Sequence, residues 1–253
     1  MRTHDRIGRS VLVAMVWALT AVSVFGSGQT EPVSPELFRI GVFVPGVVEG
    51  SPTYELLVDG VQRAAEEGST PAEESGDGQG REVTVKVVEG GFNQALWEQG
   101  LTSMAASGEY DLIVSSNPEI PDIVEAIVPN FPDQRFLIMD AWLPDNPAVH
   151  TVMFNQREQA FLAGHFAGLV STSEMSEVEG PVRAGLLAGQ EYPIMNNVIL
   201  PGYGLALRTV DPEAEVDFRV LGNWYDAGRA SELADSMYAT GSDIILTIAG
   251  GGN

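Results

Sequence analysis

Short apolar segments alternate with helical patterns along most of this chain. Apolar residues recur at helical spacing from Leu57 to Ala65, from Trp97 to Ala105 and from Ala230 to Tyr238. Repeated strand–helix–strand units predict an α/β fold whose parallel sheets are covered by helices on both faces. The segments with the length and composition of buried strands are 38–44, 83–88, 111–116, 135–140, 150–154, 182–188, 216–221 and 243–249.

The alternation restarts at Val182, after the chain leaves the first group of strands near residues 154–155. This restart indicates two Rossmann-like lobes, an N-terminal lobe over 38–154 and a C-terminal lobe over 155–253, joined by a crossover. A cleft between two lobes is a common place for a small ligand. The chain stops directly after a strand, where a doubly wound lobe needs at least another helix and strand, so we expect the C-terminal lobe to be incomplete.

Residues 1–26 have the layout of a secretory signal peptide. Three arginines precede the apolar run VLVAMVWALTAVSVF, and small residues follow it. We therefore expect an exported, periplasmic or cell-surface protein whose residues 27–37 form an N-terminal linker. The chain contains no cysteine, which excludes both disulfides and a lipid-modified N-terminal cysteine.

The formal net charge of −22 limits the classes of partner. Nucleic acid and anionic lipid surfaces are disfavoured, because both repel so acidic a protein. Lys86 is the single lysine among many carboxylates, a composition that fits proteins working in high salt, where screening relieves self-repulsion. We hold the saline habitat as a hypothesis.

Polar residues at strand ends are the first candidates for ligand contact, because open α/β sheets bind ligands at their carboxyl edges. Asp140 ends one strand beside Trp142, and its carboxylate could accept hydrogen bonds from two adjacent sugar hydroxyls. The alternative for Asp140 is a helix or turn cap. We favour ligand contact over this alternative by two to one. Ser116 and Asn117 end another strand, but Asn-Pro is equally a turn signal.

Other candidates lie at the first helix, the crossover and the C-terminal lobe. Tyr54 follows the expected helix start at Ser51 and Pro52, and its ring contacts either ligand or core. Phe154 and Asn155 are at the crossover, where hinge packing is the alternative. The remaining candidates are Tyr192, Trp224 and Asp226. For Trp224 we favour stacking on the ligand, because a large ring in a strand-end loop has little core to enter. For Asp226, capping of the following helix is a sufficient explanation.

Catalytic patterns are weak in this sequence. There is no cysteine, no GxSxG elbow and no histidine–acid cluster with metal-ligand spacing, and His165 is interpreted as packed in a core stripe with Phe161 and Leu169. The terminal AGGGN matches neither phosphate-loop pattern. We expect a protein that binds without reacting and that uses no metal or cofactor.

Six segments together resemble the basic membrane protein family of substrate-binding proteins for ABC importers, whose better-known members bind purine nucleosides. They include EYDLIVSSNP, FPDQRFLIMD and GNWYDAGRASELA, and they span 109–118, 131–140, 153–174, 182–212, 222–234 and 241–253. The resemblance implies a type I periplasmic binding protein whose lobes close on a ligand and deliver it to a membrane permease. Family members continue well beyond the AGGGN segment, in agreement with an incomplete C-terminal lobe.

One part of the family pattern is missing. Many members carry Asp…Ser-Phe-Asn before the first helix, where this chain reads EGSPTYELLVDG and only Tyr54 offers an aromatic face. The string GFNQ at 91–94 follows the second strand, and we treat its likeness to the missing motif as accidental. We predict a monomeric binding protein for a small polar ligand, a purine nucleoside, with an ABC permease as partner. Alternatives are a sensory module for a sugar or signalling compound, a nucleoside hydrolase on the same fold, and a non-functional gene fragment.

Overall fold

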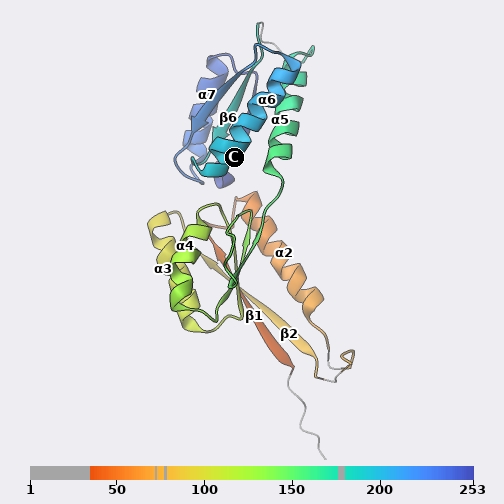
Figure 1. The fold of residues 1–253 in the computed structure, drawn as a ribbon, viewed down its shortest axis with the longest axis vertical. Coiled ribbons are helices and arrows are strands. Elements are labelled where there is room, and N and C mark those ends of the chain that lie inside the picture. The colour runs from red at the N-terminus through yellow and green to blue at the C-terminus, as the bar shows by residue number, and fades with distance from the viewer. Residues whose placement is uncertain (1–34, 72, 77–78, 176–179) are drawn as a thin grey trace, which may run out of the picture. The chain divides into compact units, whose positions relative to one another are not determined.

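The computed structural model describes residues 35–71, 73–76, 79–175 and 180–253, and Figure 1 shows their fold. The predicted signal peptide, residues 1–26, and most of the predicted linker lie outside the described residues. No helix within the described ranges is both long and apolar enough to cross a membrane.

The first sheet has five parallel strands in the order β2-β1-β3-β4-β5. The strands are β1 (Glu36–Val44), β2 (Arg81–Glu89), β3 (Leu112–Ser116), β4 (Arg135–Met139) and β5 (Val149–Val152). Helix α2 (Pro52–Gly68) covers one face, while α3 (Trp97–Ser107) and α4 (Ile120–Ile127) cover the other (Figure 1). Short helical turns η1 (Gln94–Leu96) and η2 (Val128–Asn130) complete this lobe.

Alternating side chains of the strands explain the two layers. On β1, Phe43 packs with Trp97 and the α3–α4 layer, whereas Val42 and Val44 pack with Tyr54 and the α2 layer. All five of these residues are buried. Because both faces are covered, the central strands are apolar throughout rather than alternately polar.

The second sheet has three parallel strands in the order β7-β6-β8. They are β6 (Arg183–Ala188), β7 (Glu215–Val220) and β8 (Ile244–Ile248). Helices α5 (Gln156–Ser171) and α6 (Leu200–Val210), with the π-helical turn η3 (Met195–Ile199), cover one face, and α7 (Ala227–Ala239) covers the other. A final turn, η4 (Gly250–Gly252), follows β8.

The predicted strands are all present, with ends that differ by no more than two residues from the predicted ones. The prediction named no helix at α4 or α6. Ser51 stands at the N-cap of α2, but its side chain makes no capping hydrogen bond. The first turn is held instead by Glu55, whose carboxylate accepts the N–H of Gly50 at 3.1 Å.

The predicted core stripe of α5 is wrong in part. Leu169 is 51% exposed, and His165 is only half-buried, with its Nδ1 3.1 Å from the hydroxyl of Thr209. Small residues form the packed face instead, because α5 and α6 approach so closely that a Cβ at Gly164 would lie 2.4 Å from the carbonyl oxygen of Tyr203. The close helix pair leaves no room for large side chains along its seam.

Candidate functional site

A pocket of about 660 Å³, here called the main pocket, opens at the carboxyl ends of β3 and β4. Parallel strands bring their carboxyl ends to one edge, so polar residues that are distant in sequence meet there. Most of the wall is apolar and comes from α2, α5 and β8 as well as from the strand ends. The side chains that can hydrogen-bond a ligand are those of Thr53, Ser116, Asp140, Gln156, Gln159 and Tyr192.

Among the described residues that line the main pocket, Asp140 alone carries a charged group. It follows β4 with φ +55°, a left-handed conformation that Asp tolerates better than most residues. Its carboxylate accepts a hydrogen bond from the Gln156 amide at the start of α5. Burial raises the pKa of Asp140, and the Gln156 hydrogen bond opposes that rise.

Tyr192 supplies an aromatic ring to the wall of the main pocket. Burial raises the pKa of its phenol far above the ordinary value, and the nearby charge of Asp140 raises this pKa further. The Tyr192 ring lies 6.0 Å from the Trp224 ring between centroids, with the planes tilted by 47°. The phenol is therefore a neutral hydrogen-bonding group beside the Asp140 carboxylate.

Ser116, Asn117 and Tyr54 form a buried polar group at the end of β3. The Asn117 amide donates to Tyr54 Oη at 3.4 Å, and that hydroxyl donates to the carbonyl oxygen of Pro45 at 2.9 Å. Burial raises the pKa of Tyr54 to about 12. Ser116 lines the main pocket, whereas Asn117 and Tyr54 are occupied by contacts within the protein.

A second, small pocket of about 80 Å³ adjoins the loop after β1. Tyr54 and Trp224 line it together with Phe92 and Tyr225, whose ring centroids are 4.6 Å apart. Trp224 is only 8% exposed and packs with the core cluster of α3 and α4. The expectation that this ring has little core to enter is therefore wrong, because the first lobe accommodates it.

The indole N–H of Trp224 lies near Glu119, although the two groups do not form a hydrogen bond of ordinary geometry. Burial raises the pKa of Glu119, and the indole N–H partly opposes this rise. Glu119 also donates its backbone N–H to the Asn117 side-chain oxygen at 3.0 Å. Trp224 therefore contributes to packing and polar contacts at the start of α4.

Three other predicted ligand residues lie away from the main pocket. Trp142 is 64% exposed and belongs, with Asn155, to a separate shallow pocket. Asn155 caps α5 by accepting the N–H of Glu158 at 3.3 Å, and Asp226 caps α7 by accepting the N–H of Arg229 at 2.9 Å. Phe154 lines both the shallow pocket and the main pocket.

Sequence reasoning missed several residues of the two pockets. Thr53, Gln156 and Gln159 lie at helix starts, and no local motif distinguishes them from other polar residues there. Phe92 belongs to the GFNQ string at 91–94, and it lines the small pocket. In that string Gln94 accepts a hydrogen bond from Gln190 at 3.4 Å. The available signal was an aromatic residue in the loop that follows β2.

Two lobes built on parallel sheets, with a pocket at the strand ends, have the architecture of the type I periplasmic-binding-protein fold. The fold is similar to that of an ABC transporter solute-binding protein from Aeropyrum pernix K1, with a TM-score of 0.66 and 23% identity. That alignment covers 85% of this chain and 56% of the other. The predicted fold class is thereby confirmed.

The chain belongs to the Bmp family, described as ABC transporter substrate-binding protein PnrA-like, whose match spans residues 37–253. The family prediction is confirmed. A CD4+ T-cell-stimulating antigen of Listeria innocua is 26% identical over 147 residues, which cover 58% of this chain and 39% of that protein. The ABC transporter nucleoside-binding protein BmpA of Lactococcus lactis is 25% identical over 142 residues, covering 56% and 38%. The matched region of this chain therefore corresponds to about two fifths of the length of each of these relatives.

Proposed function

We propose that this protein captures a small, uncharged polar ligand, a purine nucleoside, and delivers it to an ABC permease. The observation that carries the proposal is the main pocket, where the half-buried Asp140 carboxylate lies among neutral hydrogen-bonding groups and apolar walls. Such a composition favours a ligand with hydroxyl groups on one side and a flat apolar ring on the other. The name of the Lactococcus relative, a nucleoside-binding protein, supports the same ligand class.

The charge of the main pocket argues for a nucleoside over a nucleotide. Asp140 can accept hydrogen bonds from two adjacent hydroxyls of a ribose, and Gln156 and Gln159 can donate to or accept from them. No lysine or arginine lines the main pocket in the part of the chain that the structure describes. A phosphate group would therefore meet a carboxylate without a compensating cation.

Aromatic rings in and beside the main pocket suit the purine base. Tyr192 and Phe154 line this pocket, and Trp224 lies against Tyr192. We assign stacking to Tyr192 and Phe154, and we assign Trp224 to the support of Tyr192. Ser116 and Asp140 remain candidate polar contacts, while Tyr54, Asn117, Trp142, Asn155 and Asp226 become structural or outlying residues in this proposal.

The family supports a wider role in transport. Bmp members are substrate-binding proteins of ABC transporters, so we propose export through the segment 1–26, action as a monomer outside the cytoplasm, and binding without catalysis. A permease in the membrane is the proposed partner. These assignments rest on the family and on the sequence of the N-terminal segment.

Thermal unfolding of the purified protein with and without ligands tests the proposal. We expect adenosine, guanosine or inosine to raise the melting temperature, because a ligand that binds only the folded state stabilises it by about 2.7 kcal/mol at one hundred times its Kd. Ribose, hexoses, pyrimidine nucleosides and adenosine monophosphate are the comparison ligands. A shift with hexoses alone would replace nucleoside transport by sugar binding, and a cooperative melt that none of these compounds moves would contradict the proposed ligand.

A further inference from the structure

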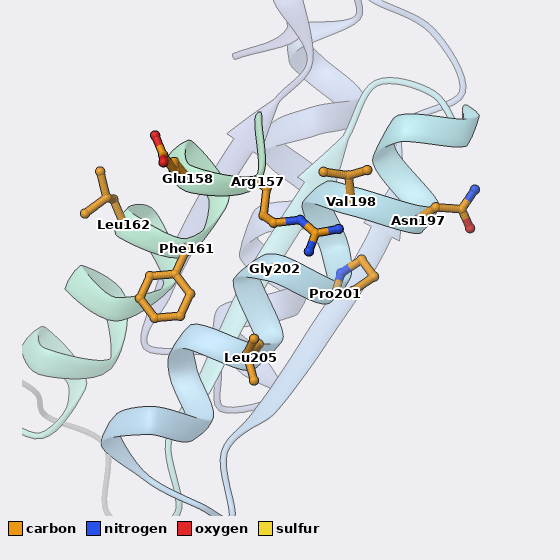
Figure 2. A pocket seen from close by; sticks show the side chains of 9 residues that line it. All are labelled: Arg157, Glu158, Phe161, Leu162, Asn197, Val198, Pro201, Gly202 and Leu205. Carbon is orange, nitrogen blue, oxygen red and sulfur yellow. The ribbon is translucent and has the colours of Figure 1, made fainter. Parts of the chain in front are cut away.

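Another pocket lies on the surface of the second lobe, between α5 and α6. This outer groove has a volume of about 510 Å³ and is formed by residues 157–162 of α5 and residues 197–205 of η3 and α6. Gly202 forms its floor, where a Cβ would lie only 3.4 Å from the Cβ of Ala160 on α5. Figure 2 shows Phe161 and Leu205 on the side of Gly202, whereas Leu162, which also lines the groove, points outward from α5. The groove is an apolar trough of the size that small ligands occupy.

The walls of the outer groove are unusually exposed for apolar side chains. Leu162 is 68% exposed and Leu205 is 57% exposed. Apolar groups of this size in one continuous surface mark binding sites more often than isolated exposed residues do. The seam between the helices is already filled by their own small residues, so the exposed walls contribute little to the packing of α5 on α6.

The helices around the outer groove are poor in acidic residues. The chain has 35 acidic and 13 basic residues, yet Glu158 is the only acid in the stretches 156–171 and 195–210, against Arg157 and Arg208. This region therefore departs from the negative charge of the whole protein. The groove lining itself holds one cation and one anion, Arg157 and Glu158, so an anion meets much less repulsion here than over the rest of the surface.

Arg157 provides the cation at one end of the outer groove. Within the described residues its guanidinium forms no ion pair and no hydrogen bond. Figure 2 shows its side chain extending from α5 toward Gly202 and Pro201, whereas the Glu158 carboxylate points away from the middle of the groove. The start of α5 adds a favourable helix dipole for an anion at the same end.

We infer that the outer groove binds an alkyl carboxylate, a medium-chain fatty acid whose carboxylate pairs with Arg157 and whose chain lies along Phe161 and Leu205. The guanidinium fork matches a carboxylate. A single arginine with Glu158 nearby suits one negative charge better than the two of a phosphate. The polar end and the apolar length of the groove correspond to the two parts of such a ligand.

Isothermal titration of the full chain with octanoate and with 1-octanol tests this inference. Both probes have the same chain length, and the net charge of −22 disfavours octanoate everywhere except beside an accessible cation. We expect octanoate to bind about fivefold more tightly than 1-octanol, the size expected of an exposed ion pair. The variant Arg157→Gln should remove this difference, and Leu205→Ser should weaken both probes.

Arg229→Gln is the matched control, because Arg229 is also exposed, also lacks an ion pair within the described residues, and lies on α7 at the opposite face of the sheet. It should leave both affinities unchanged. Equal binding of the two probes, or unchanged octanoate binding in Arg157→Gln, would overturn the inference. The inference also fails if octanoate does not bind and Leu205→Ser changes the molar mass measured by light scattering. The outer groove would then be a surface for self-association.

Discussion

The residues that end β3 and β4 have backbone conformations that most side chains avoid. Asn117 has φ +144° and Asp140 has φ +55°. Asp and Asn tolerate positive φ because their short polar side chains can hydrogen-bond nearby groups. Both residues turn the chain at the strand edge, and only Asp140 thereby lines the main pocket. Backbone of this kind is frequent at functional sites.

Asp140→Asn tests the carboxylate without changing the size of the side chain or its tolerance of positive φ. We expect the affinity for a purine nucleoside to fall about tenfold or more, since hydrogen bonds to charged groups contribute about 1.5 to 3 kcal/mol. Thermal shift and titration calorimetry measure this loss. The same change at Asp145, which is exposed and has φ +62°, should leave affinity unchanged. Equal affinities in Asp140→Asn and the unchanged protein would remove Asp140 from the site.

The Asp140 carboxyl also predicts a pH dependence. Burial raises its pKa above that of the unfolded chain, so ionisation costs the folded state more than the unfolded state. The free-energy cost of ionising Asp140 is absent below its pKa in the unfolded chain. It grows as the pH rises from that value through the higher pKa of the folded state, and then stays constant. Urea unfolding should therefore show Asp140→Asn as more stable than the unchanged protein at pH 7, with the difference disappearing toward pH 3. A difference that is the same at both pH values would contradict this cause.

Helix pairing at α5 and α6 shows how elements constrain single residues. A Cβ at Gly164 would approach the Tyr203 carbonyl oxygen, and a Cβ at Gly168 would lie 3.0 Å from Val210. Glycine is normally unfavourable inside a helix, because it loses more backbone freedom on folding. Its presence at these two positions reflects the short distance between the helices.

Gly164→Ala should lower the free energy of unfolding by about 1 to 3 kcal/mol, since the added methyl group must displace backbone. Gly60→Ala is the control, because Gly60 lies inside α2 with no atom within 4 Å of its expected Cβ. That variant should raise the free energy of unfolding by about 0.5 to 1 kcal/mol. Urea denaturation measures both values. Stabilisation by both substitutions would contradict the close contact at Gly164.

Charge is the dominant property of the whole molecule. The net charge is −22, and the ion pairs among the described residues are largely exposed, as in Arg63–Asp59 and Lys86–Glu109. Exposed pairs of this kind contribute about 0 to 1 kcal/mol each. They offset little of the repulsion among the remaining carboxylates, so the folded state carries a substantial electrostatic cost at low ionic strength.

Added salt should therefore stabilise the protein. At 0.1 M salt the screening length is about 10 Å and at 1 M it is about 3 Å, so repulsion between separated carboxylates weakens strongly over this range. We expect the urea midpoint to rise between 0.1 and 1 M sodium chloride. Sucrose of matched osmolality controls for effects that do not depend on charge. A midpoint that stays constant or falls in sodium chloride would contradict the saline hypothesis.

Much of the fold follows from local patterns in the sequence. The strands were predictable because each is a short apolar run bounded by polar or glycine-containing segments, as at 135–140. Asp226 was predictable as a cap, because capping depends on neighbours along the chain. Helix α4 was not predicted, since it is short and follows the turn signal Asn117–Pro118. The carboxyl edge, with Ser116 and Asp140, follows from strand order and direction.

Only the tertiary structure decided which candidates meet. Trp142 and Asp140 are two residues apart, yet one is exposed and the other lines the main pocket, because the chain turns at Asp140. Trp224 has a strand-end position that favoured ligand stacking, and the first lobe buries it instead. The side chain of Gln156 contacts Asp140 only because the crossover between the lobes brings the start of α5 beside the end of β4. The sequence determined the elements and their polar ends, since these depend on neighbouring residues. Which residues line each pocket was decided by the tertiary structure, because it depends on contacts between residues far apart in the chain.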